Sequence, residues 1–553
     1  METRERLIKL DVCLHQNPGH EATPYPQIEL STDDTPHKSP DDESKHILIL
    51  GAGVSGLMVA WMLLDQGHHV TIFADDWAWT KDFQKSRMTS QIAGALWEFP
   101  PGGCGLTEIE AAGEGYATVQ HYQEWALQSY EFYHKYYTKI SNPHEDRGAS
   151  LGLRFSKLHQ FFHKELDDLS PEEKDKLDAI RATHDPKNIY KANGQNKIKL
   201  TTYEDQAALE KEFKDVIEVK GGHGIPEFKS GYTHKAPILN TDKAMAYLMA
   251  VVKTKGANLE TRKFDKDAIV TEFGAKLLED YKGDAIVNAT GLGAKELAVD
   301  GDVYPVRGAV LRVDNTRRGL FRHLNDAYLV PAQKFKSKIP TKTIFIVPRS
   351  DDVLYVGSII QPGNNEKTLT QESPEVEAMW DRAGHFIPRL RHAKLVPEYP
   401  FAQGLRPFSK RNAKVRADEE ADFPLVHNYG HGGSGWTLGI GTARCAVLLL
   451  KRLLGVEDPR GKGGDEEANM KKWRDNVQEA AEKVNEELYG KPPPPKQGPD
   501  GEAQKKATTG QDMNVNGAPL TPPSSPARAG AASPKPSAGG DPLSTNSTPP
   551  AES

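Results

Sequence analysis

Two glycine-rich turns, far apart in the sequence, could hold an anionic ligand on backbone N–H groups. The first is Gly51-Ala-Gly-Val-Ser-Gly56, between an apolar run over 47–50 and a helical pattern that ends near residue 67. The second is Asn428-Tyr-Gly-His-Gly-Gly-Ser-Gly-Trp-Thr437, before a helix expected to reach about residue 454. Helix N-termini carry unpaired N–H groups and partial positive charge, which favour phosphate and other acceptors. Together the turns predict one elongated cofactor that crosses a single domain.

The first turn has the spacing G-x-G-x-x-G, in which each glycine has its own role. Gly51 permits a tight turn, Gly53 lets a pyrophosphate approach the backbone, and Gly56 lets helix and strand pack closely. A second apolar strand, over 70–74, ends in Asp75, 19 residues after Gly56. An acid at that point can bind the adenosine ribose hydroxyls. The order of strand, helix, strand and acid predicts a dinucleotide site in preference to a tight turn without a ligand.

A third segment, residues 89–97, is small and polar before it becomes apolar (Thr-Ser-Gln-Ile-Ala-Gly-Ala-Leu-Trp). Small side chains would let the backbone lie against a flat ring, although an ordinary tight loop has the same composition. Aromatic residues recur over 116–140 at helical spacing, which is more typical of a core than of a binding site. The segment 89–97 is therefore the next candidate for cofactor contact.

The elements that must position these motifs predict an α/β protein. Strand and helix alternate around the first turn, and a further buried strand is expected over 285–288. Strands over 344–348 and 353–360 are expected to pair in a second sheet. We predict a Rossmann-like dinucleotide-binding domain and a second domain built on a mixed sheet.

The two ends of the chain differ in composition from its body. Residues 1–44 lack hydrophobic periodicity and are predicted to form a disordered arm. Over 491–553, Pro, Gly and Ser make up 28 of 63 residues and none is aromatic, so this tail is also predicted to be disordered. A helix is expected over 465–489, because apolar residues follow one stripe. The charge-rich segment 155–215 is expected to be a solvated insertion, with a capping box that starts a helix at Ser170.

Composition argues against several classes of function. The net charge of −7 is mild for 553 residues, and no basic block indicates nucleic acid or an anionic membrane. The apolar runs are too short to span a bilayer, and three scattered cysteines do not suit a zinc site. We therefore expect no metal, no nucleic-acid partner and no membrane segment.

Six motifs occur in the order found in FAD-dependent D-amino-acid oxidases, a family that the chain resembles over about 46–455. They are Gly51-x-Gly-x-x-Gly56, Ala93-Gly-Ala-Leu-Trp97, Asn288-Ala-Thr-Gly291, Val306-Arg-Gly308, Gly404-Leu-Arg-Pro407 and Asn428-Tyr-Gly-His-Gly-Gly433. Many flavoproteins share the first and third motifs, whereas the last two together are far more specific. For residues 45–455, the resemblance implies an FAD-dependent oxidoreductase with discontinuous FAD-binding and substrate domains.

The resemblance also implies roles for individual residues. The residues that would contact FAD are Gly51, Ala52, Gly53, Val54, Ser55, Gly56, Asp75, Thr89, Ser90, Gly94, Ala95, Leu96, Phe264, Gly433, Ser434, Gly435, Trp436 and Thr437. The first turn would hold the pyrophosphate, Asp75 the ribose and Phe264 the adenine end. Residues 89–96 would line the flavin, and residues 433–437 would meet its pyrimidine edge.

Arg406, Gly433 and Phe345 are the residues that the resemblance places at the substrate. The guanidinium of Arg406 would bind the substrate carboxylate with two parallel donors, and the Gly433 carbonyl would accept a hydrogen bond from the amine. The implied reaction is oxidation of a D-amino acid or of D-aspartate. Hydride leaves the α carbon for flavin N5, O2 is reduced to hydrogen peroxide, and the imine hydrolyses to a 2-oxo acid and ammonia.

Three positions depart from the family pattern. Phe345 stands where a tyrosine hydroxyl usually helps to bind the carboxylate, and Thr341 stands where a lid tyrosine is usual. Glu98 replaces the glutamine of the mammalian members. We therefore keep two alternatives open. One is a related flavin oxidase that acts on another amine in a biosynthetic pathway, and the other is a non-catalytic FAD-binding protein that binds a partner.

The expected partners are an amino-acid or amine substrate and O2, and a homodimer is the one assembly that we consider. A cytoplasmic location is expected, because the printed sequence ends in Ala-Glu-Ser and not in a signal of the Ser-Lys-Leu type. A peroxisomal location is the alternative, since Arg6-Leu7 followed by Cys13-Leu14 comes close to an N-terminal signal that Cys13 interrupts.

Overall fold

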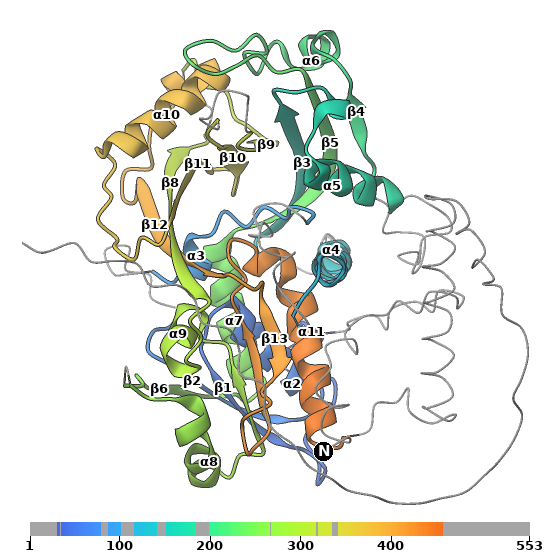
Figure 1. The fold of residues 1–553 in the computed structure, drawn as a ribbon, viewed down its shortest axis with the longest axis vertical. Helices are drawn as coiled ribbons and strands as arrows, with labels where there is room; N and C mark the ends of the chain where they lie inside the picture. The colour runs from blue at the N-terminus through green and yellow to red at the C-terminus, as the bar shows by residue number, and fades with distance from the viewer. Residues whose placement is uncertain are drawn as a thin grey trace, which may run out of the picture. The chain divides into compact units, whose positions relative to one another are not determined.

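A computed structural model describes residues 30–33, 35–78, 87–100, 116–140, 151–183, 198–265, 267–316, 319–333 and 341–456. Two β-sheets with helices on their faces make up this part of the chain (Figure 1). The predicted helix over 465–489, the predicted tail over 491–553 and the first 29 residues of the predicted arm lie outside the described residues.

The first sheet has six strands in the order β13-β14-β7-β1-β2-β6. They are β13 (Lys414–Ala417), β14 (Leu425–Tyr429), β7 (Ala285–Asn288), β1 (His46–Leu50), β2 (His69–Ala74) and β6 (Asn258–Thr261). All neighbours are parallel except β13 and β14. Ile49 belongs to the core on one face of β1 and Leu50 to the core on the other, which explains the continuous apolar run. The strand order reverses at β1, where ligands bind in such sheets.

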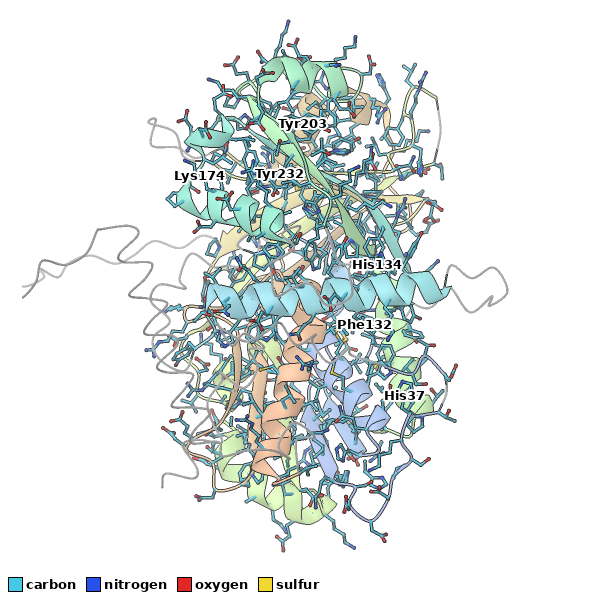
Figure 2. All side chains as sticks on the ribbon, turned by 90° about the vertical axis from the view of Figure 1, so that its right-hand side faces the viewer. His37, Phe132, His134, Lys174, Tyr203 and Tyr232 are labelled. Atoms are coloured by element: carbon cyan, nitrogen blue, oxygen red, sulfur yellow. The ribbon has the colours of Figure 1, made fainter. Side chains whose placement is uncertain are left out.

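Helices cover both faces of the first sheet. α2 (Val54–Asp65) packs against α11 (Gly435–Leu453) on one face, and α8 (Val270–Tyr281) lies on the other. α4 (Val119–Ile140) packs across α11, as Figures 1 and 2 show from two sides. The predicted aromatic core over 116–140 is confirmed, since Trp125 and Tyr133 are fully buried and the Tyr133 hydroxyl donates to the Trp436 carbonyl at 2.7 Å.

The second sheet has eight strands in the order β12-β8-β11-β10-β9-β3-β5-β4. They are β12 (Phe401–Ser409), β8 (Val303–Asp314), β11 (Val353–Pro362), β10 (Ile344–Pro348), β9 (Ala327–Val330), β3 (Leu153–Phe162), β5 (Ser230–Leu239) and β4 (Thr201–Tyr203). β3 and β9 are parallel and the other neighbours are antiparallel, so the sheet is mixed, as predicted. The predicted pairing of β10 with β11 is confirmed.

One face of the second sheet is covered by α10 (Pro374–Phe386), whose Val376 and Met379 share a core with Ile346. The opposite face is directed toward α3 (Thr89–Ile92) and carries the candidate site. The remaining α-helices of the described residues are α5 (Pro171–Ala182), α6 (Gln206–Phe213), α7 (Thr241–Thr254) and α9 (Ala294–Leu297). Within the described part of the chain, no helix combines the length and apolar character needed to cross a membrane.

The described end of the N-terminal arm packs against α2. The Ser31 N–H donates to the Asp65 carboxylate at 2.7 Å, and the Trp61 indole donates to the Ser31 carbonyl at 3.0 Å. Lys255 lies 2.8 Å from Asp65 and donates to the Thr35 carbonyl at 2.6 Å. The structure therefore differs from the prediction of a disordered arm up to residue 44, because two buried charges satisfy polar backbone groups of the arm.

Replacing Lys255 with Met is expected to destabilise the protein by about 3–5 kcal/mol, since it leaves the Asp65 carboxylate buried without a counter-charge. The two side chains are 0% and 2% exposed, so water cannot take the place of the lysine. Urea unfolding followed by circular dichroism measures the change. The double variant Asp65→Asn/Lys255→Met is the control and should recover part of the loss; equal losses in both variants would contradict this explanation.

Candidate active site

The first glycine turn connects β1 to α2 and crosses the end of β7. Gly51 has φ of +106°, and a Cβ there would lie 2.5 Å from the Ala289 carbonyl oxygen. A Cβ on Gly56 would lie 2.0 Å from the Gly51 carbonyl oxygen. Gly53 differs, because an added Cβ would meet only the Ser90 Oγ, at 3.5 Å, which is an ordinary contact. The packing of the protein itself requires glycine at 51 and 56, whereas Gly53 leaves space that a pyrophosphate can use.

Ser90 connects the two glycine-rich helix starts. The Val54 N–H donates to the Ser90 hydroxyl at 3.1 Å, and the Trp436 indole donates to the Ser90 carbonyl at 3.0 Å. A Cβ on Gly435 would lie 3.3 Å from Val54, so the first turns of α2 and α11 are neighbours. Neither helix has a side-chain N-cap bond or an acidic residue in its first turn. Two adjacent helix starts whose N-cap residues form no side-chain bond suit one elongated anionic ligand, with Ser90 already accepting from the Val54 N–H.

The second glycine turn is attached to β12. The Gly432 N–H donates to the Pro407 carbonyl at 2.8 Å, and the His431 ring lies 3.5 Å from the Ser55 hydroxyl. Burial lowers the pKa of His431 to about 4, so this ring is neutral at pH 7. The predicted cofactor residues over 433–437 are therefore held between the start of α2 and the strand that carries the candidate arginine.

Asp75 directly follows β2, at the carboxyl edge of the first sheet, as predicted. Its side chain is 65% exposed, and the Lys263 ammonium lies 3.8 Å from the carboxylate. Phe264 is next in the chain and stacks on Phe273 of α8, with ring centroids 4.9 Å apart. The structure brings Asp75 and Phe264 to one edge, where the resemblance places the ribose and the adenine.

The segment around α3 lies against the second sheet. The Thr89 hydroxyl donates to the Leu405 carbonyl of β12 at 3.0 Å. The Phe345 ring of β10 packs against Gly94, where an added Cβ would approach two ring carbons to 2.6 Å. The predicted flavin-lining segment and the predicted substrate-facing phenylalanine are therefore neighbours.

Arg406 lies on β12 opposite Val306 of β8, and its guanidinium reaches β11. One nitrogen donates to the Ile359 carbonyl and another to the Ser358 hydroxyl, both at 3.2 Å. No carboxylate among the described residues pairs with it, and burial lowers the pKa of Arg406 to about 10, so it stays charged at pH 7. The Arg406 side chain is half-buried, and a half-buried cation without a carboxylate is costly. Its donors suit the carboxylate of a ligand.

Gly308 of β8 lies directly beneath this guanidinium. A Cβ at 308 would lie 2.2 Å from the nearest Arg406 nitrogen. The sequence motif contained Gly308 but gave it no role, because the contact depends on the pairing of β8 with β12. Ser358 was also missed, since nothing in the sequence places its hydroxyl beside the arginine.

Gly308→Ala is expected to raise KM for the substrate about 10- to 100-fold, because it displaces the guanidinium and loses charge-assisted hydrogen bonds worth roughly 1.5–3 kcal/mol. Steady-state kinetics and the flavin-to-protein ratio are the measurements, and the ratio should not change. Gly404→Ala is the matched control, since Gly404 is opposite Gly308 and its added Cβ would make only a 3.4 Å contact with Ile92. Equal effects of the two substitutions would refute this role.

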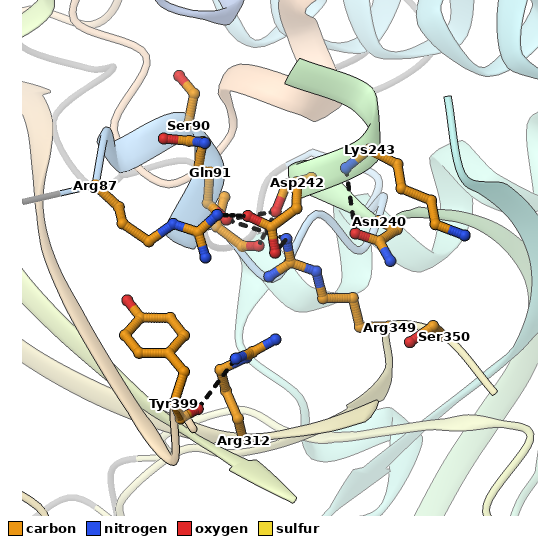
Figure 3. A network of polar contacts seen from close by, with 12 residues as sticks. Arg87, Ser90, Gln91, Asn240, Asp242, Lys243, Arg312, Arg349, Ser350 and Tyr399 are labelled. Atoms are coloured by element: carbon orange, nitrogen blue, oxygen red, sulfur yellow. Dashed lines mark hydrogen bonds and ion pairs between the residues drawn. The ribbon is translucent and has the colours of Figure 1, made fainter. Parts of the chain in front are cut away.

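A network of ion pairs next to the site connects α7 to the second sheet (Figure 3). Asp242, in the first turn of α7, pairs with Arg87 through one oxygen and with Arg349 at 3.0 Å through the other. Arg349 follows β10 and donates to the Gln91 carbonyl at 3.1 Å. The sequence did not single out these residues, because an acid in the first turn of a helix is common at helix starts.

A second ion pair joins α5 to Glu98, which follows the predicted flavin-lining segment. Glu98 pairs with Lys176, and their side chains are 20% and 5% exposed. The predicted capping box at the start of α5 is present, but the prediction of a solvated insertion was wrong for this helix, since Leu177 and Ile180 are buried with Lys176. The spacing of these three residues on one helical face is the signal that could have indicated burial.

A mostly parallel sheet covered on both faces, with a glycine turn at its switch point and a second helix start beside that turn, defines an α/β dinucleotide-binding protein. The profile of the FAD dependent oxidoreductase family matches residues 46–449. The chain belongs to this family, and FAD is its cofactor.

Several characterised proteins are similar to this chain. The D-amino-acid oxidase of Schizosaccharomyces pombe is 26% identical over 425 residues, which cover 74% of this chain and 97% of that enzyme. The D-amino acid oxidase of Dugesia ryukyuensis is 23% identical over 420 residues, covering 74% and 98%. The D-amino-acid oxidase of Rubrobacter xylanophilus is 34% identical over 227 residues, covering 40% and 60%. These relatives place the chain among the FAD-dependent amino-acid oxidases.

A solved structure shares the fold. Glycine oxidase from Geobacillus kaustophilus aligns with a TM-score of 0.51 at 18% identity, over 76% of this chain and 100% of that one. At this level of identity the similarity concerns the fold alone.

Proposed function

We propose that this protein oxidises a D-amino acid, or D-aspartate, to the imine, which hydrolyses to a 2-oxo acid and ammonia. The observation that carries the proposal is Arg406, a half-buried cation for which the described residues supply no carboxylate. Its guanidinium contacts β11, which pairs with the strand that carries Phe345, and Phe345 contacts Gly94. FAD held by these residues would supply the two-electron oxidation of the substrate, with O2 as the final electron acceptor and hydrogen peroxide as the reduced product.

The residues of the chain then supply binding and orientation. Arg406 fixes the substrate carboxylate by two parallel hydrogen bonds, and the Gly433 carbonyl accepts from the substrate amine. The uncapped start of α11, at residues 435–437, stabilises negative charge on the adjoining cofactor edge. In this proposal the residues over 51–56, Asp75, 89–96, Phe264 and 433–437 hold FAD.

The names of the relatives support a D-amino acid as the substrate, since they are D-amino-acid oxidases and D-aspartate oxidases. One observation favours a different amine as the second candidate. Phe345 has no hydroxyl, and the Thr341 hydroxyl donates to the Gln333 carbonyl at 3.4 Å, so neither side chain adds a donor for the substrate carboxylate beside Arg406. Binding of the carboxylate then depends on Arg406, with Ser358 beside it.

Bleaching of the flavin tests the proposal. Purified protein is mixed under nitrogen with a panel of D-amino acids, their L-enantiomers and simple amines, and the flavin absorbance is followed. D-amino acids should bleach it and the L-enantiomers should not, and admission of air should restore the colour with formation of hydrogen peroxide. Bleaching by an amine without a carboxylate would favour the second candidate, and a flavin that no amine reduces would favour a non-catalytic FAD-binding protein.

A further inference from the structure

One face of the Arg406 guanidinium lies against the second sheet. A Cβ built on Gly308 would lie 2.2 Å from Nη1, 2.3 Å from Cζ and 2.4 Å from Nη2. A point almost equidistant from these three atoms, at that range, lies to one side of the guanidinium plane. The backbone of Gly308 is therefore the surface on which the group rests, and the edges of the group point sideways across the sheet.

Two acceptors on β11 occupy one edge of this guanidinium. Nη1 donates to the Ile359 carbonyl and Nη2 to the Ser358 hydroxyl, both at 3.2 Å. The Ser358 hydroxyl donates in turn to the Ile359 carbonyl, so the two acceptor oxygens are themselves 3.2 Å apart. Acceptors this close to each other are reached by both nitrogens only through the edge that Nη1 and Nη2 share. Protein groups therefore already satisfy the Nη1–Nη2 edge.

The second pair of parallel donors consists of the Nε–H and the remaining N–H of Nη2. Among the described residues, Arg406 has two hydrogen-bond acceptors, and neither is bonded to Nε. Along β11 the step from Ile359 to Ser358 leads toward Gly357, which is opposite Phe345 on β10. Because Nη2 is the nitrogen on the Ser358 side, the Nε–Nη2 edge faces Phe345.

We propose that the substrate carboxylate binds at the Nε–Nη2 edge, between Arg406 and Phe345, and that Ser358 is a positioning residue that keeps this edge directed at the substrate; this inference rests on the proposed function. An arginine fork is effective only when both donors are aligned with both carboxylate oxygens. Without the Ser358 hydroxyl, Nη2 loses the acceptor that fixes the direction of the fork. Ser358 therefore supports selection of a carboxylate over the corresponding amide, which has only one acceptor oxygen.

Ser358→Ala should weaken binding of a carboxylate more than binding of its amide. The probes are propanoate and propanamide, whose Kd values are measured with the holoenzyme from changes in flavin absorbance. We expect the preference for propanoate to fall about 3- to 10-fold, because one hydrogen bond that orients the fork is lost. With the D-amino acid that is oxidised best, the change should appear in KM rather than in kcat. Ser350→Ala is the matched control, since the Ser350 hydroxyl, on the turn between β10 and β11, donates to Asp352 at 2.6 Å.

The Arg406→Lys background separates positioning from a purely structural role. An ammonium is a point charge without paired edges, so adding Ser358→Ala to Arg406→Lys should leave the propanoate preference nearly unchanged. Equal changes in both backgrounds, or a lower Tm of Ser358→Ala with an unchanged preference, would overturn the inference. Wild-type protein that prefers propanoate but oxidises no D-amino acid would refute the proposed reaction and not the carboxylate site. Equal affinity of wild-type protein for the two probes would refute the site itself.

Discussion

The Arg406→Ala variant is expected to lose roughly 30-fold to several thousand-fold in kcat/KM, the equivalent of about 2–5 kcal/mol. This range is typical when one partner of a buried, hydrogen-bonded charge pair is removed. In the proposed function the other partner is the substrate carboxylate, since the described residues supply none. The measurement is steady-state oxidation of the best D-amino acid found in the bleaching panel.

Flavin content and thermal stability distinguish loss of substrate binding from damage to the fold. Burial lowers the pKa of Arg406 to about 10, so the folded protein holds this proton less tightly than the unfolded chain does. The charged guanidinium therefore lowers the stability of the folded protein at neutral pH. Replacing Arg406 with alanine breaks no ion pair among the described residues. Arg406→Lys should recover only part of the activity, since a point charge cannot make two parallel hydrogen bonds. Unchanged oxidation of every tested amine by Arg406→Ala would rule out the carboxylate role.

The sequence was sufficient to predict those features that depend on residues close to one another in the chain. The turn from β1 to α2 was predicted because Gly51 and Gly56 must be glycine for steric reasons that act within a few residues or at the adjacent strand end. The strands β7, β10 and β11 were predicted because a short apolar run with defined ends is typical of a buried strand. Membership of the family and the cofactor followed from motifs in a fixed order.

The contacts that complete the site could not be predicted, because they depend on pairing between distant segments. The role of Gly308 depends on the register of β8 with β12, and the position of Ser90 depends on the approach of α11 to α2. Lys176 belongs to a charge-rich stretch, and only the packing of α5 shows that its ammonium is buried. The docking of Ser31 and Thr35 likewise depends on the buried Asp65–Lys255 pair.

Gly53→Val is expected to abolish FAD binding and to leave the fold intact. The backbone at 53 has φ of −73° and ψ of 177°, which valine adopts without strain. An added Cβ makes only a 3.5 Å contact with the Ser90 hydroxyl, so the first carbon of the new side chain meets no clash within the protein. The bulkier side chain would occupy the space where the pyrophosphate must approach the start of α2. The flavin-to-protein absorbance ratio should fall close to zero, with an unchanged circular dichroism spectrum.

The thermal response to added FAD makes this test quantitative. A ligand at 100 times its Kd stabilises the folded state by about 2.7 kcal/mol, so the Tm of wild-type protein stripped of flavin should rise with FAD concentration, whereas that of Gly53→Val should not. Gly56→Ala is the matched control, because its Cβ would lie 2.0 Å from the Gly51 carbonyl oxygen. That variant should lose stability even without FAD. Normal flavin occupancy in Gly53→Val would show that the pyrophosphate does not bind at the first turn. The placement of FAD across the two helix starts would then have no basis.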